Sequence, residues 1–231
     1  MSGFAPMPKD AARAIAQAFL PNHPLGNRYD YYYTWAKLRS DPLYAGVTDA
    51  LRGTDAPVLD LGCGLGLLAH ALRAAGIALP YRGVDIAAGK IARAQRAATR
   101  AGLAGATFEA RDLADGTPSH AGSVAILDVL QFVPPDAQPV ILDAAIAMLT
   151  PGARLVIRTG FDDGSARART TRRIDVLSRL VGWMNATPKR YPERDDLQRR
   201  FDAAGLASRI EPLHGDTPFN NWLVVAERPR A

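Results

Sequence analysis

A run of alternating glycines is the feature of this sequence that points most directly to chemistry. Residues 58–66 read VLDLGCGLG, in which Asp60 is followed by Gly62, Gly64 and Gly66. Glycines at this spacing let the backbone turn sharply and approach a ligand with no Cβ in the way. Open α/β sheets bind their ligands at the carboxyl ends of strands. We therefore expect a ligand-binding loop here, between a strand and a helix.

Two common glycine loops do not fit this segment. A dinucleotide-binding loop of the form G-x-G-x-x-G would need its third glycine at position 67, where the chain has Leu67. A nucleoside triphosphate loop would end in Gly-Lys-Ser or Gly-Lys-Thr, and the chain has no such run. The aspartate before the glycines also favours a cationic ligand over a pyrophosphate.

The elements that must position this loop follow from the hydrophobic pattern. From about residue 56 onward, short apolar runs alternate with helical patterns, which is typical of a parallel α/β sheet. Strands are predicted at 58–61, 81–84, 106–109, 123–127, 154–157, 207–211 and 222–226. Helices are predicted at 67–75, 88–101, 136–149 and 193–204. The sequence therefore predicts an α/β fold with a seven-stranded, mostly parallel, doubly wound sheet.

Two segments fall outside this alternation. Residues 1–50 are mostly helical in pattern, so we expect an N-terminal helical cap on a core of residues 51–231. Residues 159–192 are polar, rich in arginine and too long for a simple connection, and a helix is predicted at about 171–184. We expect this segment to be a helical insertion after strand five, over one end of the sheet.

The composition limits the class of protein. The 231 residues, 48% of them hydrophobic and 22% charged, are enough for one well-buried core. The single cysteine, Cys63, excludes a disulfide framework and a multi-cysteine zinc site. Residues 11–20 lack the unbroken apolar stretch of a signal peptide, and no run reaches the roughly 18 apolar residues of a membrane span. We therefore expect a soluble, cytoplasmic protein without a membrane partner.

The net charge of +5 is concentrated in one region. Between Arg154 and Arg200, twelve lysines and arginines stand against six acidic residues, so the rest of the chain is nearly neutral. A basic segment of this kind could serve RNA, an anionic small molecule or an acidic partner protein. It could also be an ordinary solvated surface.

The ordered motifs resemble those of the class I S-adenosylmethionine-dependent methyltransferases. The resemblance covers roughly residues 55–158 and rests on the loop 60–66 followed by Val84-Asp85. It implies that the loop cradles the methionine part of the cofactor, S-adenosyl-L-methionine. It also implies that Asp85 holds the two ribose hydroxyls, since one carboxylate offers two acceptor oxygens to a vicinal diol. The segment 111–113 would hold the adenine, and 128–131 would line the methyl-donor side. The cofactor-binding residues expected on this basis are Asp60, Gly62, Cys63, Gly64, Gly66, Asp85, Ile86, Arg111, Asp112, Leu113, Asp128 and Val129.

Some of these residues have a second interpretation. Asp112 and Asp128 could each cap the helix that follows, a common role for aspartate after a strand. Cys63 could be a nucleophilic thiol, but it lies between the loop glycines, where the family often has a small residue or a cysteine in a packing role. We therefore do not expect Cys63 to be catalytic.

The residues after the fourth strand narrow the class of acceptor. Methyltransferases that act on exocyclic amines carry Asn/Asp-Pro-Pro-aromatic at this point, whereas residues 128–135 read DVLQFVPP. Cytosine C5 methylation would need a catalytic cysteine outside the donor loop. Residues 127–135 instead resemble the Asp-Val-Leu-His-Tyr pattern of small-molecule methyltransferases of bacterial secondary metabolism, with Gln131 in place of the histidine. We expect no metal.

Aromatic residues before the first strand are candidates for the acceptor site. Residues 28–39 read RYDYYYTWAKLR, and as a helix they could close over donor and acceptor, although ordinary packing of the helix accounts for part of them. His214 follows a late strand and is the candidate base, whereas His70 is expected to pack or to lie at the surface. The residues expected to contact the acceptor are Tyr32, Tyr33, Gln131, Trp183 and Asn220.

The tyrosine-rich segment and Asn220-Asn221-Trp222 before the last strand are also similar to stand-alone methyltransferases of aryl-polyene and related polyketide pigment pathways. This resemblance implies an acceptor tethered to an acidic carrier protein, which the basic segment would attract. The sequence thus favours methyl transfer to oxygen or carbon of a small organic acceptor. Two alternatives stay open: an RNA methyltransferase, although nucleic acid is the less expected partner, and a non-catalytic cofactor-binding protein.

Overall fold

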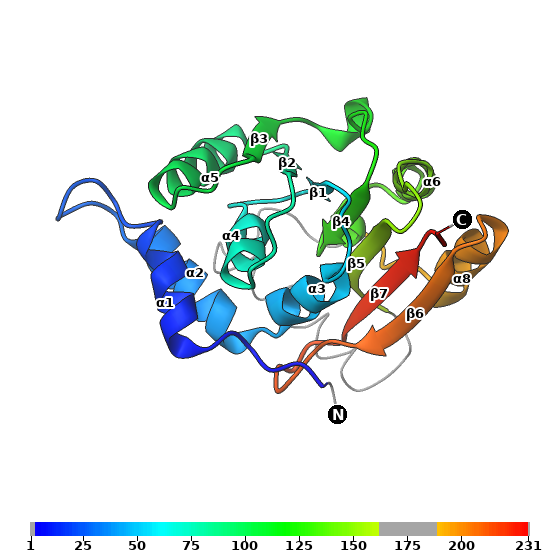
Figure 1. Ribbon diagram of the computed structural model, residues 1–231, viewed down its shortest axis with the longest axis horizontal. Coiled ribbons are helices and arrows are strands. Elements are labelled where there is room, and N and C mark those ends of the chain that lie inside the picture. Colours follow the sequence, from blue (N-terminus) through cyan, green and yellow to red (C-terminus); the bar gives the residue numbers. More distant parts are fainter. Residues whose placement is uncertain (1–2, 162–188, 231) are drawn as a thin grey trace.

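A seven-stranded sheet forms the centre of the computed structural model, which describes residues 3–161 and 189–230 (Figure 1). The strands are β1 (Val58–Leu61), β2 (Tyr81–Asp85), β3 (Ala106–Ala110), β4 (Ser123–Leu127), β5 (Arg154–Gly160), β6 (Ala207–Pro212) and β7 (Asn221–Glu227). The helices are α1 (Lys9–Gln17), α2 (Tyr29–Ser40), α3 (Leu43–Leu51), α4 (Leu67–Ala74), α5 (Ala88–Arg100), α6 (Ala137–Ala147) and α8 (Arg194–Ala203). Two short 3-10 turns, η1 (Leu113–Asp115) and η2 (Leu130–Phe132), follow β3 and β4.

The strand order places a ligand-binding edge beside β1. The order is β3-β2-β1-β4-β5-β7-β6, and the pairs among β1 to β5 are parallel. Only β7 runs the other way, antiparallel to both β5 and β6, so β6 points in the same direction as β5. The predicted seven-stranded, mostly parallel sheet is confirmed. The strand order reverses between β1 and β4, which is where open α/β sheets bind ligands.

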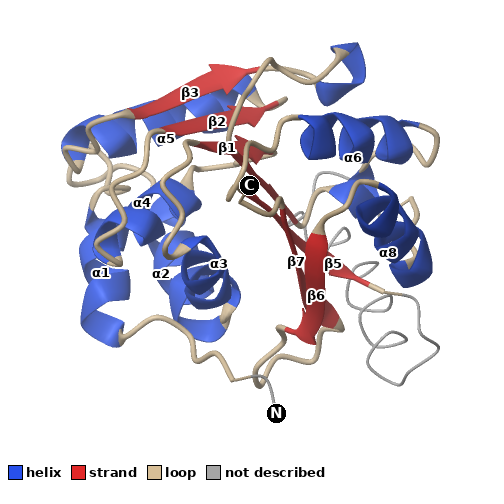
Figure 2. Cartoon of the chain, turned by 45° about the vertical axis from the view of Figure 1, so that its right-hand side comes forward, coloured by secondary structure: helices blue, strands red, loops and turns tan. Residues whose placement is uncertain are grey.

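Helices cover both faces of the sheet, as the buried strands require (Figure 2). On one face α6 and α8 pack against the sheet through residues such as Ile141, Leu142 and Phe201. On the other face α3, α4 and α5 do so through residues such as Val47 and Leu68. This doubly wound arrangement leaves the carboxyl ends of the strands as the open edge.

The N-terminal helices α1 and α2 pack on α4 and α5 rather than on the sheet. Ile15, Leu38, Leu67 and Ala97 belong to one buried cluster that joins these four helices. In contrast, α3 lies directly against β5 and β7. The helical character expected for residues 1–50 is therefore present, and its last helix is part of the sheet's own covering layer.

Part of the predicted insertion cannot be compared with the structure. The helix predicted at about 171–184, with Trp183, lies outside the described residues. The predicted insertion begins at about residue 159, but β5 continues through Gly160, which pairs with Asn221 of β7. The strand therefore ends later than the sequence predicts.

Candidate active site

Two of the three glycines in the loop between β1 and α4 lie against neighbouring side chains, and the third faces open space. Gly62, Gly64 and Gly66 have φ angles of 80°, 56° and 71°, in the left-handed region that favours glycine. A Cβ on Gly62 would collide with Val129, and one on Gly66 would collide with Phe108. A Cβ on Gly64 would meet no atom of the described residues within 4 Å. The loop therefore leaves space for a ligand in front of Gly64.

Asp85, at the end of β2, lies beside this open space. Its Oδ2 accepts a hydrogen bond from the Gly64 N–H at 2.9 Å, and its Oδ1 accepts one from the Ala87 N–H at 2.8 Å. Each carboxylate oxygen keeps a further lone pair, so the side chain can still accept from two hydroxyl groups. The next residue, Ile86, is 68% exposed and offers an apolar surface at the same strand end.

Asp60, in β1 directly before the loop, is a buried acid with one unused oxygen. The Tyr81 hydroxyl donates to its Oδ2 at 2.5 Å, while its Oδ1 has no hydrogen-bond partner among the described residues. Burial raises the pKa of Asp60 to about 7, although the bond from Tyr81 opposes the shift. A buried carboxylate without a compensating charge fits a cationic ligand at this loop.

Cys63 packs and does not act as a nucleophile in this structure. A Cβ on Gly83 would lie 2.7 Å from the Cys63 Sγ, which shows how closely the thiol approaches β2. Burial raises the pKa of the thiol far above its ordinary value, and the charges of Asp60 and Asp85 act in the same direction. The thiol is therefore protonated and unreactive.

A buried arginine joins the end of β4 to the segment that follows α2. Arg158 of β5 is 2% exposed, and its Nη1 donates to Asp128 Oδ2 at 2.7 Å and to Asp41 Oδ2 at 2.9 Å. Burial alone would lower the pKa of Arg158, but the two carboxylates raise it. Burial alone would raise the pKa of Asp41, but Arg158 and Lys37 lower it below its ordinary value. Arg158 and Asp41 thus hold each other ionised.

Lys37 brings α2 to the same place. Its Nζ lies 2.7 Å from Asp41 Oδ2 and 3.8 Å from Asp128 Oδ2. One turn earlier, Tyr33 is 43% exposed and stacks on Tyr29 with ring centroids 6.0 Å apart. Burial around the hydroxyl raises the pKa of Tyr33, while Lys37 opposes the shift. The exposed tyrosines of α2 are therefore tied to the end of β4.

Sequence reasoning missed Lys37, Asp41 and Arg158 as members of this site. One signal was present, because Arg158 interrupts the apolar run of β5 and a charge in a buried strand requires a partner. The partners themselves lie 117 and 30 residues away along the chain, and no local pattern connects them.

The two aspartates with a capping alternative behave differently. Asp112 Oδ1 accepts from the Ala114 N–H at 2.8 Å and caps the turn η1. Asp128 does not cap: it has the left-handed φ of 59°, and its carboxylate pairs with Arg158. Contact of either residue with the cofactor stays a prediction.

The segment predicted to hold the adenine is fixed to β2. The Arg111 N–H donates to the Asp85 carbonyl at 3.0 Å, and the Arg111 guanidinium pairs with Glu109 at 2.8 Å. Leu113 begins η1 and is half-buried. These contacts place residues 111–113 next to the end of β2, as the cofactor prediction requires.

The residues predicted to contact the acceptor differ in their exposure and in their hydrogen bonds. Tyr32 is 56% exposed, and Gln131 is buried with a side-chain oxygen that makes no hydrogen bond in the described part of the chain. Asn220 is buried, donates from its amide to the Phe161 carbonyl at 2.8 Å, and accepts from Trp222 Nε1 at 3.1 Å. Its side chain thus links β5 to β7, and a role toward an acceptor stays a prediction.

His214 follows β6, at the same edge of the sheet. Its Nδ1 is 2.7 Å from the Gly215 carbonyl, which can only accept, so Nδ1 carries the hydrogen and Nε2 can take a proton. Gly215 lies against Pro42, the residue after Asp41: a Cβ on Gly215 would be 3.3 Å from Pro42 Cγ. His70, in contrast, is 3% exposed and packs on Phe19.

Comparison with known proteins agrees with this geometry. Residues 58–152 match the family model described as a methyltransferase domain. This part of the chain is therefore similar to a methyltransferase domain. No curated protein matches the chain.

Solved structures share the fold of this methyltransferase domain and of much of the remaining chain. An O-methyltransferase family protein from Burkholderia thailandensis is 19% identical, with a TM-score of 0.61 over 87% of this chain and 60% of that one. The magnesium protoporphyrin IX methyltransferase of Synechocystis PCC 6803, solved with S-adenosylhomocysteine, is 19% identical, with a TM-score of 0.63 over 95% and 93%. Mitomycin 7-O-methyltransferase is 21% identical, with a TM-score of 0.63 over 93% and 60%. The chain therefore spans about 60% of the length of two of these three proteins.

Methyltransferase domains of this class use S-adenosylmethionine, and the residues of this chain fit it. The open space at Gly64 admits a ligand, Asp85 keeps lone pairs for two hydroxyls, and the unpartnered Asp60 oxygen suits a cationic methionine end. In residues 3–161 and 189–230, no three His, Cys, Asp or Glu side chains are grouped so that they could hold a metal ion. Among the described helices, none has the length and apolar character needed to cross a membrane.

Proposed function

We propose that this protein transfers a methyl group from S-adenosylmethionine to an oxygen or carbon atom of a small organic acceptor. The observation that carries this proposal is the position of α2 against the donor edge. Lys37 Nζ lies 3.8 Å from Asp128 Oδ2, directly after β4. The exposed Tyr33 lies one helical turn before Lys37, so it stands close to the end of β4, the strand beside β1 in the sheet. An aromatic surface at that point can hold an organic acceptor against the donor.

The donor would lie along the ends of β1 and β2. Asp85 accepts from the ribose hydroxyls, and the exposed Ile86 packs against the adenine ring. Asp60 compensates the positive charge of the methionine end, which also lowers the pKa of this acid from about 7. When bound, S-adenosylmethionine supplies an electrophilic methyl group for in-line attack by the acceptor.

The acceptor side must align the nucleophile and exclude water. Because its pKa is raised, the Tyr33 hydroxyl is protonated and can donate a hydrogen bond to an acceptor oxygen. Tyr32 adds exposed aromatic surface, and Gln131 adds an unpartnered amide oxygen. His214, whose Nε2 is free to take a proton, stays the candidate base for an acceptor long enough to reach it.

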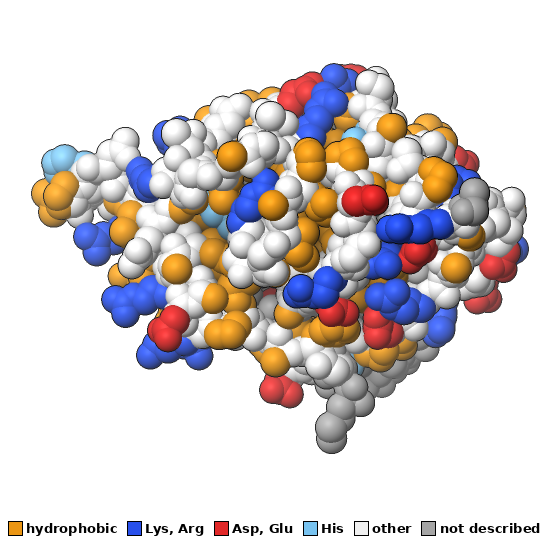
Figure 3. Space-filling model, in the orientation of Figure 1, with side chains coloured by type: hydrophobic (Ala, Val, Ile, Leu, Met, Phe, Trp, Pro, Cys, Tyr) orange, Lys and Arg blue, Asp and Glu red, His pale blue; other side chains and the backbone are white. Residues whose placement is uncertain are grey.

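The charges of the described surface favour a small acceptor over RNA. Arg154 pairs with Glu227 at 2.8 Å, and Arg200 pairs with Asp143 at 2.6 Å. Arg158 is buried. On the side of β6 and α8, basic and acidic side chains lie interspersed (Figure 3). Paired arginines release few counterions on binding a phosphate backbone, so Arg154 and Arg200 themselves give little support to an RNA site.

Two of the similar structures are named for methyl transfer to a ring-bearing compound, magnesium protoporphyrin IX and mitomycin. They support a ring-bearing acceptor for this chain as well. The finer form of the proposal is an acceptor of a pigment pathway attached to an acidic carrier protein, which the basic residues between 154 and 200 would attract.

The first experiment is calorimetric titration with S-adenosylhomocysteine and, in parallel, with NAD. We expect micromolar binding of the first ligand alone. Labelled S-adenosylmethionine is then incubated with phenols, enolisable ring compounds and mixed RNA. We expect label in a small-molecule product, less label with Asp85→Ala, and unchanged labelling with Asp49→Ala, which removes an exposed carboxylate of α3.

Three results would contradict the proposal. Binding of NAD instead of S-adenosylhomocysteine would exclude the donor. Label in RNA would establish the alternative acceptor. Binding of S-adenosylhomocysteine without transfer to any acceptor, including those of a whole-cell extract, would favour a cofactor-binding protein without catalysis.

A further inference from the structure

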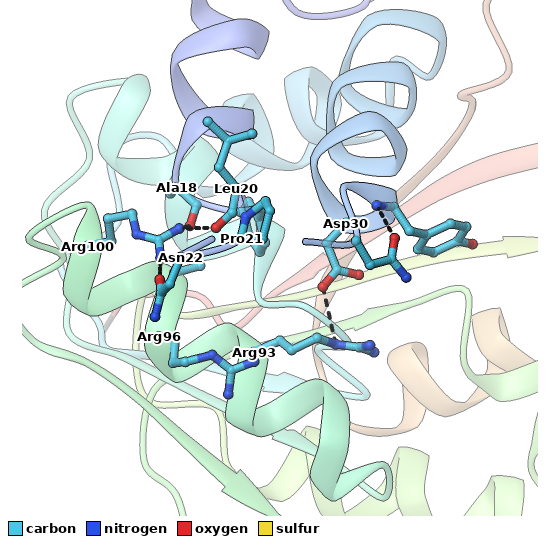
Figure 4. A pocket seen from close by; sticks show the side chains of 12 residues that line it. Ala18, Leu20, Pro21, Asn22, Asp30, Arg93, Arg96 and Arg100 are labelled. Atoms are coloured by element: carbon cyan, nitrogen blue, oxygen red, sulfur yellow. Dashed lines mark hydrogen bonds and ion pairs between the residues drawn. The ribbon is translucent and has the colours of Figure 1, made fainter. Parts of the chain in front are cut away.

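A cavity of about 380 Å³ lies between α5 and the segment that joins α1 to α2 (Figure 4). Three arginines of α5 line it, Arg93, Arg96 and Arg100. Because they are three and four residues apart, they share one face of the helix. None of the residues expected to bind the methyl donor lines this cavity.

The cavity carries an uncompensated positive charge. Asp30 is the one carboxylate among its lining residues, so the formal charge of the lining is +2. Arg93 Nε lies 3.4 Å from Asp30 Oδ2, but this nitrogen is buried and makes no hydrogen bond within residues 3–161 and 189–230. Arg96 is exposed and makes no ion pair or hydrogen bond with any described residue. Two guanidinium groups therefore have free donors at this cavity.

Arg100 fixes the opposite wall. Its guanidinium donates to the Ala18 carbonyl at 2.8 Å, to the Leu20 carbonyl and to Asn22 Oδ1. These acceptors are neutral, so they hold the segment after α1 in place and leave the charge of Arg100 uncompensated. The wall is thus built before a ligand arrives, which reduces the ordering cost of binding.

The remaining lining is apolar or can donate hydrogen bonds. Phe19 and Tyr29 contribute rings, and Phe19 is supported from behind by His70 at a centroid distance of 5.1 Å. Asn27 Oδ1 is occupied by the Tyr29 N–H at 2.8 Å, so its amide nitrogen is the group left to face a ligand. The cavity therefore offers ring surface as well as positive charge.

We propose that this cavity binds a phosphate monoester whose body is apolar and ring-bearing. Near neutral pH a phosphate monoester carries a charge of about −1.5 to −2, which matches the +2 of the lining. Guanidinium groups match phosphate oxygens in geometry as well as charge. A carboxylate or a sulfate ester carries one charge and would leave one arginine uncompensated.

The test is calorimetric titration at fixed ionic strength with phenyl phosphate, phenyl sulfate and inorganic phosphate. We expect phenyl phosphate to bind more tightly than both, since the sulfate lacks a charge and inorganic phosphate lacks the ring. Loss of a charge-assisted hydrogen bond predicts that Arg96→Gln weakens phenyl phosphate binding about tenfold or more. Asp30→Asn is expected to tighten binding, because it removes the competing carboxylate.

Arg13→Gln is the matched control. Arg13 is exposed in α1, does not line the cavity, and its replacement removes the same charge from the protein. We expect its phenyl phosphate affinity to stay within about twofold of the unaltered protein. S-adenosylhomocysteine binding by each variant shows that it is folded.

Each of three outcomes would overturn the proposal. The first is no binding of phenyl phosphate by the unaltered protein. The second is equal weakening by Arg96→Gln and Arg13→Gln, which would mean general charge attraction. The third is equal affinity for phenyl phosphate and phenyl sulfate. These measurements do not involve methyl transfer, so they leave the proposed function untouched.

Discussion

Replacing Gly64 by alanine adds one methyl group at the place where the donor is proposed to lie. Gly64 has a φ of 56°, and an L-residue in this left-handed region costs about 1–2 kcal/mol. No atom lies within 4 Å of the added Cβ, so no collision adds to this cost. We expect Gly64→Ala to lower the free energy of unfolding by about 1–2 kcal/mol.

The affinity for S-adenosylhomocysteine should fall as well, because the new methyl group occupies space that the ligand needs. Adding a methyl group to a packed contact costs about 1–3 kcal/mol, so the dissociation constant should rise about 5-fold to 150-fold. Urea unfolding measures the first effect, and calorimetric titration measures the second.

Gly76→Ala is the control for backbone strain. Gly76 follows α4 with a φ of 75°, and a Cβ there also meets nothing within 4 Å. It should lose the same stability as Gly64→Ala and keep the full affinity for S-adenosylhomocysteine. If the two variants bind that ligand equally well, the donor does not lie in front of Gly64, and the reasoning from the open glycine is refuted.

Four further predictions concern single side chains. Asp85→Ala should weaken S-adenosylhomocysteine binding by about 1.5–3 kcal/mol in calorimetry, as expected for hydrogen bonds to a charged group; unchanged affinity would mean that the ribose is held elsewhere. His214→Ala should lower the turnover number more than the cofactor affinity, and untouched turnover would remove it as the base. In urea unfolding, Arg158→Met should lower the free energy of unfolding by about 3 kcal/mol, because it leaves two carboxylates without their buried partner. A loss below about 1 kcal/mol, as for an exposed surface ion pair, would contradict the importance of the Arg158 ion pairs. Burial lowers the pKa of His70 from 6.5 to about 4, so the folded state binds that proton less readily than the unfolded chain. The stability linked to His70 is therefore complete above pH 6.5 and is lost as the pH falls toward 4, by about 3 kcal/mol. In urea unfolding across this range His70→Leu should show a smaller loss, and equal slopes for the two proteins would contradict the shift.

The sheet could be predicted from the sequence because its central strands β1, β4, β5 and β7 are buried on both faces. Such strands appear as short apolar runs between helical patterns, and the seven runs correspond to the seven strands within a few residues. The strand order and the reversed direction of β7 could not be predicted in this way. They depend on which strands pair, and pairing between distant segments leaves no local pattern.

The donor side of the site followed from local motifs, and the acceptor side did not. Gly62 to Gly66 and Asp85 lie in sequence immediately after their strands, so the spacing places them at the ligand edge. Lys37 and Asp41 reach the same edge through the packing of α2, which the sequence of α2 does not reveal. The capping role of Asp112 was one of two open alternatives, and the structure shows it directly.

Arg158 also explains why the N-terminal helices and the sheet form one functional unit. The sequence suggests a cap of residues 1–50 on a separate core, since helices alone precede the first strand. Yet Asp41, inside that cap, holds a fully buried guanidinium of β5 together with Asp128 at the end of β4. A buried charge that lost one of two partners would be strongly destabilising. The position of α2, and with it Tyr33 and Lys37, is therefore set by the same ion pairs that hold the end of β4, so one buried side chain would align the proposed acceptor surface with the proposed donor edge.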